Sequence, residues 1–550
     1  MSNQTSVSKK TQSIIAGGLI SSAGIFFAKF IGLFYAVPYN TLLATADNIA
    51  YYGVAYQIYS YLLNICIAGF PFAIATLIAK YSAKGDYQTS LLIKKLSSLL
   101  MISFGFIMMS FVIVFATPLA KLVLPDNANN INTMRMVLIL ISFALFFVPI
   151  LSSVRGFYQG LKHMEVYALS QVLEQIARIV FLLIASAIAI YACNADNVWA
   201  LYFGVISTSI AAVLAIIHIK LYDKKQMVEI KKLARNQSVE GNSNKKEIIK
   251  ELVFIAFPYL LVAILGYSDT IVNTLFLNKG LAAFGNVDSE IVLISGTINY
   301  GVLKLMSIPM ILAPGFSAAI IPHITTALTN HDYKLVQKNI RDCIEIVLYI
   351  GLPISFCLFV FAKPIYAILF PPADPKNLEL CAEILSWFSI EAFLGTIAPI
   401  FTSLLMSVGL RKVNIRNLVI MVAIKFSIAY PLLKYFGFKG IVLSSILAMG
   451  TFIFMNAYAL TKNFHINWIY TFHKLLIILG AMLALFLCAR GLSFLGLKGY
   501  GAGRLVSLVQ LAISGTLSLG VYFAITYAFQ IPQTILHLDL SRITKKFKRG

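Results

Sequence analysis

The sequence predicts an all-α polytopic membrane protein with about fourteen transmembrane helices, and three observations support this. Of its 550 residues, 59% are hydrophobic and 12% are charged, whereas a soluble protein carries roughly 25% charged residues. Long apolar runs succeed one another along the chain, each near the ~20 residues that cross a bilayer. A residue pattern of the first half recurs in the second. This composition excludes a soluble enzyme, a disordered protein and a secreted disulfide scaffold.

The apolar runs are separated by polar breaks, and each run is one expected helix. The first run is too long for a cleavable signal and lacks a small-residue cleavage site, so it should remain as the first transmembrane helix. In chain order the expected helices lie near residues 13–39, 49–79, 97–117, 136–158, 165–192, 198–221, 251–277, 293–323, 342–362, 379–408, 417–437, 440–461, 474–493 and 505–530.

Lysine and arginine set the expected orientation. They favour the N-terminus, the C-terminal tail and the loops after even-numbered helices over the other loops by roughly three to one. The positive-inside rule therefore places both termini on the cytoplasmic side of the membrane. The same rule accounts for the net charge of +22, so no nucleic-acid partner is expected.

The longest polar stretch, near the middle of the chain, suggests the domain organisation. It is lysine-rich, contains Gly241 to Asn244, and is interpreted as a cytoplasmic linker. The expected regions are an N-lobe at 1–222, the linker at 223–250, a C-lobe at 251–463, a final helix pair at 464–530 and a basic cytoplasmic tail at 531–550.

An internal repeat supports two equivalent lobes. The string GFPFAI at 69–74 resembles GFSAAI at 315–320, and FATPLAKLVLP at 115–125 resembles FAKPIYAILFP at 361–371, both at an offset of 246 positions. The Asp-Tyr pairs at 86–87 and 332–333 keep the same offset. Helices 1–6 and 7–12 are then two parallel six-helix copies, an architecture of transporters with a substrate path between the lobes.

Ionisable residues within the apolar runs are the candidate site residues, since each costs roughly 2.5–3.5 kcal/mol on insertion scales. Lys29 belongs to the first predicted lobe and Lys304 to the second, and both are expected to face a cavity. Lys29 could instead extend its ammonium to the membrane surface or form a structural pair. Pro309 and the Pro314–Gly315 pair should break the helix of Lys304 and line that cavity. Two cations facing one cavity favour an anionic substrate.

Three further groups of charges have structural or coupling interpretations. Glu174 and Arg178 are spaced i, i+4 and are expected to form an internal pair rather than to contact substrate. Asp269 and Lys425 could neutralise each other, or Asp269 could hold a coupling ion. Glu391 is either a protonatable site or a buried neutral carboxyl.

Arg155, at the end of the fourth helix, has two interpretations: an interfacial anchor, or a cytoplasmic gate residue that meets an anionic headgroup. The six cysteines are scattered without CxxC spacing, so no metal or disulfide framework is expected. No Walker A, GxSxG or HExxH motif is present, which predicts no catalytic residues and no cofactor.

Several motifs resemble those of MurJ-type lipid II flippases. Phe26 to Gly32 (FFAKFIG) is similar to their first-helix motif, and KLMSIP at 304–309, IIP at 320–322 and NHDY at 330–333 are similar to their eighth-helix region. Arg155 to Lys162 and Gln171 to Arg178 resemble the Gram-positive branch, which includes stage V sporulation protein B and YtgP-like proteins. The resemblance covers essentially the whole chain and identifies the multidrug, oligosaccharidyl-lipid and polysaccharide (MOP) exporter superfamily.

This resemblance implies two lobes around a central cationic cavity, a groove for a polyprenyl tail at helices 13 and 14, and alternating access. It implies that Lys29 and Lys304 hold the lipid diphosphate; both are arginine in Gram-negative members, and lysine loses the bidentate fork. Further arginines of those members correspond here to Tyr35 and the region of Asn64. Asp269 matches the acid of a sodium site in some relatives, although Lys425 could serve as a built-in counter-ion.

The sequence thus predicts a lipid II flippase rather than an enzyme. It would perform no covalent chemistry and would work as a monomer in contact with the lipids of a bacterial cytoplasmic membrane. Na⁺ or H⁺ remains open as coupling ion. Alternatives are a flippase for another lipid-linked saccharide, such as a capsule, teichuronic or O-antigen-like unit, and a MATE-type cation or drug antiporter, which the cations in helices 1 and 8 disfavour. A membrane-embedded polymerase or glycosyltransferase would need an acidic or metal-binding cluster in sizeable polar loops.

Overall fold

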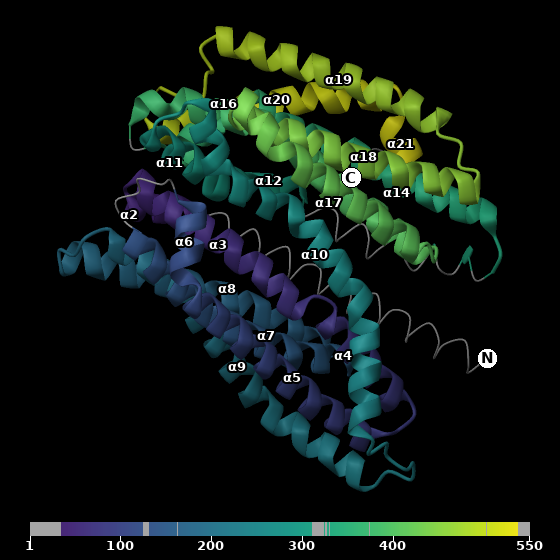
Figure 1. Ribbon diagram of the computed structural model, residues 1–550. Coiled ribbons are helices and arrows are strands. Elements are labelled where there is room, and N and C mark those ends of the chain that lie inside the picture. Colours follow the sequence, from purple (N-terminus) through teal and green to yellow (C-terminus); the bar gives the residue numbers. More distant parts are fainter. Residues whose placement is uncertain are drawn as a thin grey trace, which may run out of the picture. The chain divides into compact units, whose positions relative to one another are not determined.

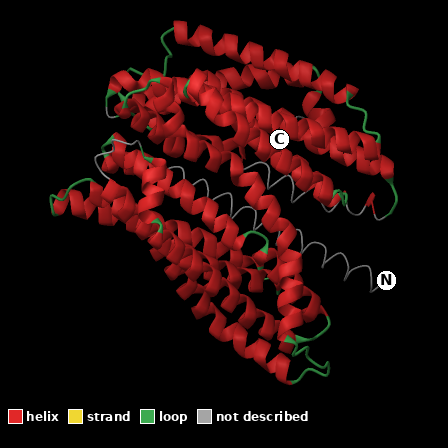
Figure 2. Cartoon of the chain, in the orientation of Figure 1, coloured by secondary structure: helices red, strands yellow, loops and turns green. Residues whose placement is uncertain are grey.

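The computed structural model describes residues 35–124, 131–161, 163–310, 324, 327–328, 330–372, 374–501 and 503–536. In this part of the chain the regular structure is helical, joined by short loops, as Figure 2 shows. This confirms the predicted all-α fold.

The helices follow one another with few long connections (Figure 1). In chain order they are α2 (Ala36–Leu43), α3 (Ala46–Ile67), α4 (Phe70–Ala83), α5 (Tyr87–Val114), α6 (Ala116–Val123), α7 (Ile131–Gly160), α8 (Met164–Ala187), η1 (Ile188–Ala192), α9 (Val198–Arg235), α10 (Lys245–Phe284), α11 (Asp288–Gly296), η2 (Thr297–Val302), α12 (Leu303–Met310), α14 (Tyr333–Val360), α15 (Ala362–Leu369), η3 (Pro375–Asn377), α16 (Leu378–Ser407), α17 (Arg411–Phe436), α18 (Phe438–Phe464), α19 (Ile469–Phe494), α20 (Arg504–Ala528) and α21 (Ile531–Leu536).

Thirteen helical segments of the described residues are long and apolar enough to cross a membrane. They coincide with the second to fourteenth predicted helices, whereas most of the first lies outside the described residues. Several begin earlier than predicted: α5 starts at Tyr87 rather than near 97, and α14 at Tyr333 rather than near 342. Hydropathy detects only the apolar part of a helix, and these helices continue through polar residues beyond it.

The second span is broken at Gly69, between α3 and α4. Gly69 has φ +78°, and a Cβ placed there would lie 2.5 Å from the carbonyl oxygen of Ala256 on α10. Both the left-handed backbone and the close approach of α10 therefore require glycine. Pro71 follows in the first turn of α4, where its missing N–H costs no helical hydrogen bond.

The internal repeat is visible in local structure. Asp86 caps α5 by accepting from the Thr89 N–H at 2.9 Å, and Asp332 caps α14 by accepting from the Leu335 N–H at 3.0 Å. Both helices have 28 residues, and each ends at a phenylalanine of similar backbone conformation, Phe115 (φ −96°, ψ 13°) or Phe361 (φ −104°, ψ 23°). Equivalent sequence positions thus start and end equivalent helices.

The chain divides into two compact units, Met1–Ala282 with Asn286–Tyr300, and Ala283–Gly285 with Gly301–Gly550. The first has a core that contains Leu77, Ile93, Tyr158, Ile219 and Leu252, from α4, α5, α7, α9 and α10. The core of the second draws on α14, α16, α18, α19 and α20. This division keeps α10 and α11 with the first unit, whereas the predicted lobes divide at 223–250; those lobe boundaries stay a prediction.

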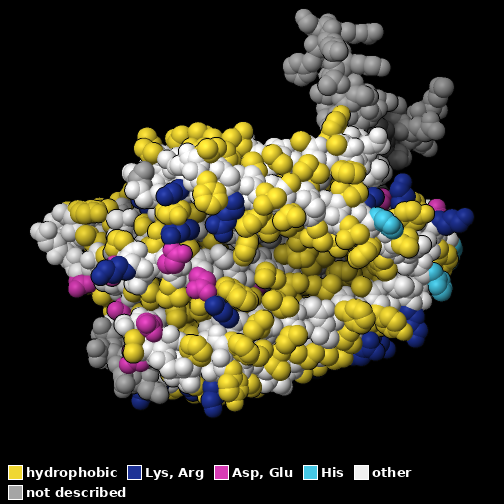
Figure 3. Space-filling view, turned by 90° about the horizontal axis from the view of Figure 1, so that it is seen from above, with side chains coloured by type: hydrophobic (Ala, Val, Ile, Leu, Met, Phe, Trp, Pro, Cys, Tyr) yellow, Lys and Arg dark blue, Asp and Glu magenta, His cyan; other side chains and the backbone are white. Residues whose placement is uncertain are grey.

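Large apolar side chains remain on the outside of the spans, as Figure 3 shows for one face. Val114 is 72% exposed, Phe254 78% and Phe494 91%. Exposed apolar surface of this extent is unfavourable in water but is solvated by lipid chains. The structure is therefore that of a multi-pass membrane protein.

The predicted linker at 223–250 is mostly helical, because α9 continues to Arg235 and α10 begins at Lys245. The short loop between them is bound to the first turn of α5. The Gln237 side-chain oxygen accepts from the N–H groups of Tyr87 and Gln88, both at 2.9 Å, and the Asn242 N–H donates to Thr89 Oγ1 at 2.7 Å. The loop thus satisfies backbone donors that the start of α5 leaves open.

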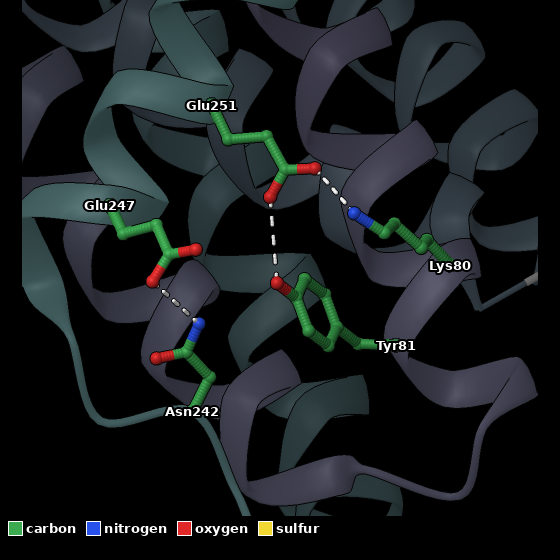
Figure 4. Close-up of polar contacts among 5 residues, drawn as sticks. All are labelled: Lys80, Tyr81, Asn242, Glu247 and Glu251. Carbon is green, nitrogen blue, oxygen red and sulfur yellow. Dashed lines mark hydrogen bonds and ion pairs between the residues drawn. The ribbon is translucent and has the colours of Figure 1, made fainter.

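The start of α10 is held to the end of α4 by a second group of contacts (Figure 4). Lys80 Nζ lies 2.5 Å from Glu251 Oε1, and the Tyr81 hydroxyl donates to the other carboxylate oxygen at 3.4 Å. Asn242 reaches Glu247 at 3.4 Å. The segment between the two halves is therefore a docked connection within the first unit.

We predict that Asp86→Asn destabilises the protein by about 1 kcal/mol near pH 7, because the amide keeps a capping oxygen but removes the charge, and hydrogen bonds to charged groups are stronger than neutral ones by about that amount. Asp86 is 3% exposed; burial raises its pKa, but hydrogen bonds from Thr89, Gln237 and Asn242 outweigh this and leave the pKa below its ordinary value. A carboxylate with a depressed pKa stabilises the fold above its unfolded pKa of about 4, and this contribution is lost as pH falls through the folded pKa.

The measurement is thermal unfolding of both proteins in detergent between pH 7 and pH 3. The difference between them should shrink as the pH falls below about 4. A difference that stays constant across this range would show that the charge on Asp86 does not matter.

Candidate functional site

The helix that carries Lys304 follows an irregular stretch. Residues Thr297–Val302 form the π-helical η2, directly before α12. Gln57 on α3 donates to the Asn299 carbonyl at 3.3 Å, and Thr274 on α10 donates to the Asn299 side-chain oxygen at 3.2 Å. A Cβ on Gly53 would lie 2.9 Å from the Asn299 backbone, so glycine permits this packing. π-Helical turns recur at functional sites, and this one is held by side chains of two other helices.

Lys304 itself lies in a span and is half-buried, and its Nζ is removed from solvent. Pro309 lies inside α12 and is buried; its role in a helix break that lines the cavity stays a prediction. α12 packs on α16, where a Cβ on Gly395 would lie 2.0 Å from Met310 Cε. The structure thus brings the helix of Lys304 against the helix of Glu391, whose side chain is 3% exposed.

Arg155 on α7 is buried and paired in this structure, and its two interpretations, interfacial anchor and cytoplasmic gate residue, stay predictions. Its Nη2 lies 2.8 Å from Glu174 Oε2 on α8, and its Nε donates to Ser170 Oγ at 2.8 Å. Glu174 therefore pairs with Arg155, which corrects the expected Glu174–Arg178 pair. The i, i+4 spacing put Arg178 within reach, but an arginine from the neighbouring helix takes the carboxylate.

Arg178 lies instead among tyrosines. Its Nη1 donates to the Tyr56 hydroxyl at 3.3 Å and its Nη2 to the Tyr35 hydroxyl at 3.2 Å, and its guanidinium carbon is 5.3 Å from the centre of the Tyr35 ring. Tyr52 continues the cluster, stacked on Tyr56 with centroids 6.0 Å apart, and its ring meets that of Tyr300 edge-on at 5.5 Å. Arg178 is 9% exposed.

Sequence reasoning missed this tyrosine cluster. The signal was present, because Tyr52, Tyr56 and Tyr59 recur at the i, i+4, i+7 spacing that places them on one face of α3. The contributions of Tyr35 and Tyr300 could not be found in the same way, since they come from positions far apart in the chain.

The other predicted charges are buried in separate units. Asp269, 2% exposed, accepts from Asn273 at 3.4 Å in the first unit. Lys425, 1% exposed, donates in the second unit to Ser444 Oγ at 2.8 Å, Ser445 Oγ at 2.7 Å and the Ile441 carbonyl at 3.3 Å. An all-oxygen environment of this kind suits a buried ammonium.

Three predicted site residues, Lys29, Pro314 and Gly315, lie outside the described residues. The described part therefore places one of the two expected cavity cations, Lys304. Arg178, which was also predicted, has hydroxyl partners rather than the expected carboxylate.

Comparison with known proteins agrees with this architecture. Residues 14–328 match the family described as "Polysaccharide biosynthesis protein", and residues 300–431 match the family described as MatE. The chain is 30% identical over 440 residues to "Lipid II flippase MurJ" of Bacillus subtilis (strain 168), covering 79% of this chain and 80% of that one. It is 23% identical over 369 residues to "Stage V sporulation protein B" of the same organism, covering 65% and 67%.

Among solved structures, "Lipid II flippase MurJ, inward closed conformation" shares the fold, with a TM-score of 0.64 at 14% identity over 93% of this chain and 99% of that one. The matched region of the first family exceeds half of the chain. The chain belongs to the polysaccharide biosynthesis protein family, within the MOP superfamily of membrane transporters.

Proposed function

We propose that the protein is a flippase that moves lipid II, an undecaprenyl-diphosphate-linked peptidoglycan precursor, across the bacterial cytoplasmic membrane by alternating access. The observation that carries this proposal is Lys304, a lysine in a membrane span whose ammonium is removed from solvent directly after a π-helical turn. Such a residue is retained in a membrane for function. The similarity to a protein named as a lipid II flippase supports the choice of substrate.

The mechanism requires binding and movement but no covalent chemistry. Lys29 and Lys304 would hold the diphosphate as point charges, while the polyprenyl tail stays in lipid beside α19 and α20. An empty cationic site is driven toward the negative cytoplasm, because one charge crossing the full field gains about 2.3 kcal/mol per 100 mV. Asp269 and Glu391 are the buried acids at which a coupling Na⁺ or H⁺ would bind.

The test is flipping in proteoliposomes that contain the purified protein and either lipid II or an unrelated undecaprenyl-diphosphate oligosaccharide. We expect lipid II to move to the opposite leaflet at least about tenfold faster than the other lipid, the discrimination that 1.4 kcal/mol provides. Protein-free liposomes give the background. Equal rates for the two lipids would rule out a dedicated lipid II flippase.

A second candidate is a flippase for another lipid-linked saccharide. The family description and the similarity to stage V sporulation protein B favour it, because neither names lipid II. Faster movement of the other oligosaccharide lipid in the same assay would establish this function.

A further inference from the structure

Arg178 forms a buried cationic centre in the first unit whose bonding is incomplete. A guanidinium has five N–H donors. Two of its nitrogens donate to tyrosine hydroxyls, and Nε is buried without a hydrogen-bond partner in the described part of the chain. Buried polar groups normally find partners, so an orphaned donor on a charged group calls for an explanation.

The acidic residue one turn from this arginine does not serve as its counter-ion. Glu174, one helical turn away on α8, lies in the ion pair with Arg155. Of the residues that the structure does not describe, 1–34 contain no Asp or Glu, and the acids among the others are Asp126 and Asp539. The group of Arg155, Glu174 and Arg178 therefore carries a net positive charge within membrane spans, where an uncompensated charge is unfavourable.

We propose that Arg178 and the hydroxyls of Tyr35 and Tyr56 form an anion-binding element for a phosphate or diphosphate group. Arginine binds phosphoryl oxygens bidentately, and such oxygens supply both the missing acceptors and the missing charge. Tyr56 accepts one bond from Arg178 and keeps its own O–H to donate. Tyr56 is only half-buried, whereas Arg178 is 9% exposed.

As applied to transport, this inference rests on the proposed function, since the lipid-linked diphosphate would be the anion. It differs from that proposal in its residues: the diphosphate would be recognised by an arginine of α8 and by tyrosine hydroxyls, in addition to the lysines. Free inorganic diphosphate has the same chemistry, so both forms are needed as probes.

The test measures binding of inorganic diphosphate and of undecaprenyl diphosphate to the purified full-length protein in detergent, with sulfate as a comparison ion. Arg178→Gln should weaken binding of at least one of the two by about tenfold or more, because hydrogen bonds to charged groups are the strong class. The affinity of Arg178→Lys should lie between those of the wild type and Arg178→Gln, and Tyr56→Phe should weaken binding by a few-fold. Arg135→Gln is the matched control, since Arg135 is an exposed arginine of the same unit.

Binding only of the lipid form, with loss in Arg178→Gln, identifies the lipid as the source; binding of both identifies the phosphoryl group alone. Wild-type affinity in a folded Arg178→Gln or Arg178→Lys protein, or no binding to wild type, would overturn the inference. Flipping separates the two proposals. If Arg178→Gln changes neither binding nor lipid II movement, the anion site is contradicted and the flippase proposal stands. If binding depends on Arg178 but the wild-type protein does not move lipid II, the anion site stands and the flippase proposal is contradicted.

Discussion

Lys304→Gln is expected to reduce flipping by about 100-fold and to prevent complementation of a flippase-depleted strain. The substitution leaves a polar side chain that is one atom shorter and removes the ammonium, which lies in a membrane span and is removed from solvent. A charge-assisted contact to a phosphoryl group contributes up to about 3 kcal/mol, so transport should fall by about 100-fold. Lys304→Arg keeps the charge and should retain most of the activity.

The matched control is Lys434→Gln, which removes one charge from an exposed position of the same unit. Flipping rates in proteoliposomes and growth of the depleted strain are the two readouts. Wild-type rates in a well-folded Lys304→Gln protein would contradict a role of this lysine in substrate handling. A separate variant, Lys29→Ala, tests the second cation that the sequence predicts.

Lys474→Met is expected to cause the largest loss of stability, about 3–5 kcal/mol, the usual cost of breaking a buried ion pair from one side. Glu345 on α14 is 2% exposed; its carboxylate accepts from Lys474 Nζ at 2.5 Å and from Thr471 Oγ1 at 2.7 Å, both on α19. Removal of the lysine leaves a buried carboxylate without its cation. Because these contacts tie α19 to α14, the change should also loosen the helix expected to border the lipid tail.

The measurement is chemical or thermal unfolding of the purified protein in detergent. The double variant Glu345→Gln/Lys474→Met should recover part of the loss, because it removes the orphaned charge. The control is Lys439→Met, which breaks the 2.7 Å pair with Glu383, where both side chains are 40% or more exposed. This surface pair should contribute about 0–1 kcal/mol. Equal effects of the two lysine substitutions would show that burial of Glu345 does not set the cost.

Local patterns in the sequence predicted the spans and much of the repeat correctly. An apolar run is a property of neighbouring residues, so hydropathy located thirteen of the expected helices, and capping positions such as Asp86 and Asp332 recurred at one offset. The polar extensions of α5 and α9 beyond their apolar parts were not predicted, because polar residues continue a helix without changing its hydrophobic signal.

The candidate site was predicted less completely, because it depends on which side chains the tertiary structure brings within hydrogen-bond distance of each charge. The i, i+4 rule allowed Glu174 to meet Arg178, but it contains nothing about α7, from which Arg155 takes the carboxylate. Because Glu174 is paired with Arg155, Arg178 donates instead to the hydroxyls of Tyr35, directly before α2, and Tyr56 on α3. Lys425 likewise obtained its oxygen ligands from α18, sixteen to twenty positions away.

By itself, the sequence determined that this chain is a helical membrane protein with an internal repeat and a few charged residues in its spans, since these features follow from composition and local periodicity. Only the tertiary structure decided how those charges are paired, that the central polar segment docks onto α5, and that a π-helical turn precedes Lys304. The physical reason is that a buried charge or an open backbone donor is satisfied by whatever group packing brings within hydrogen-bond distance, and packing joins residues that are distant in the chain.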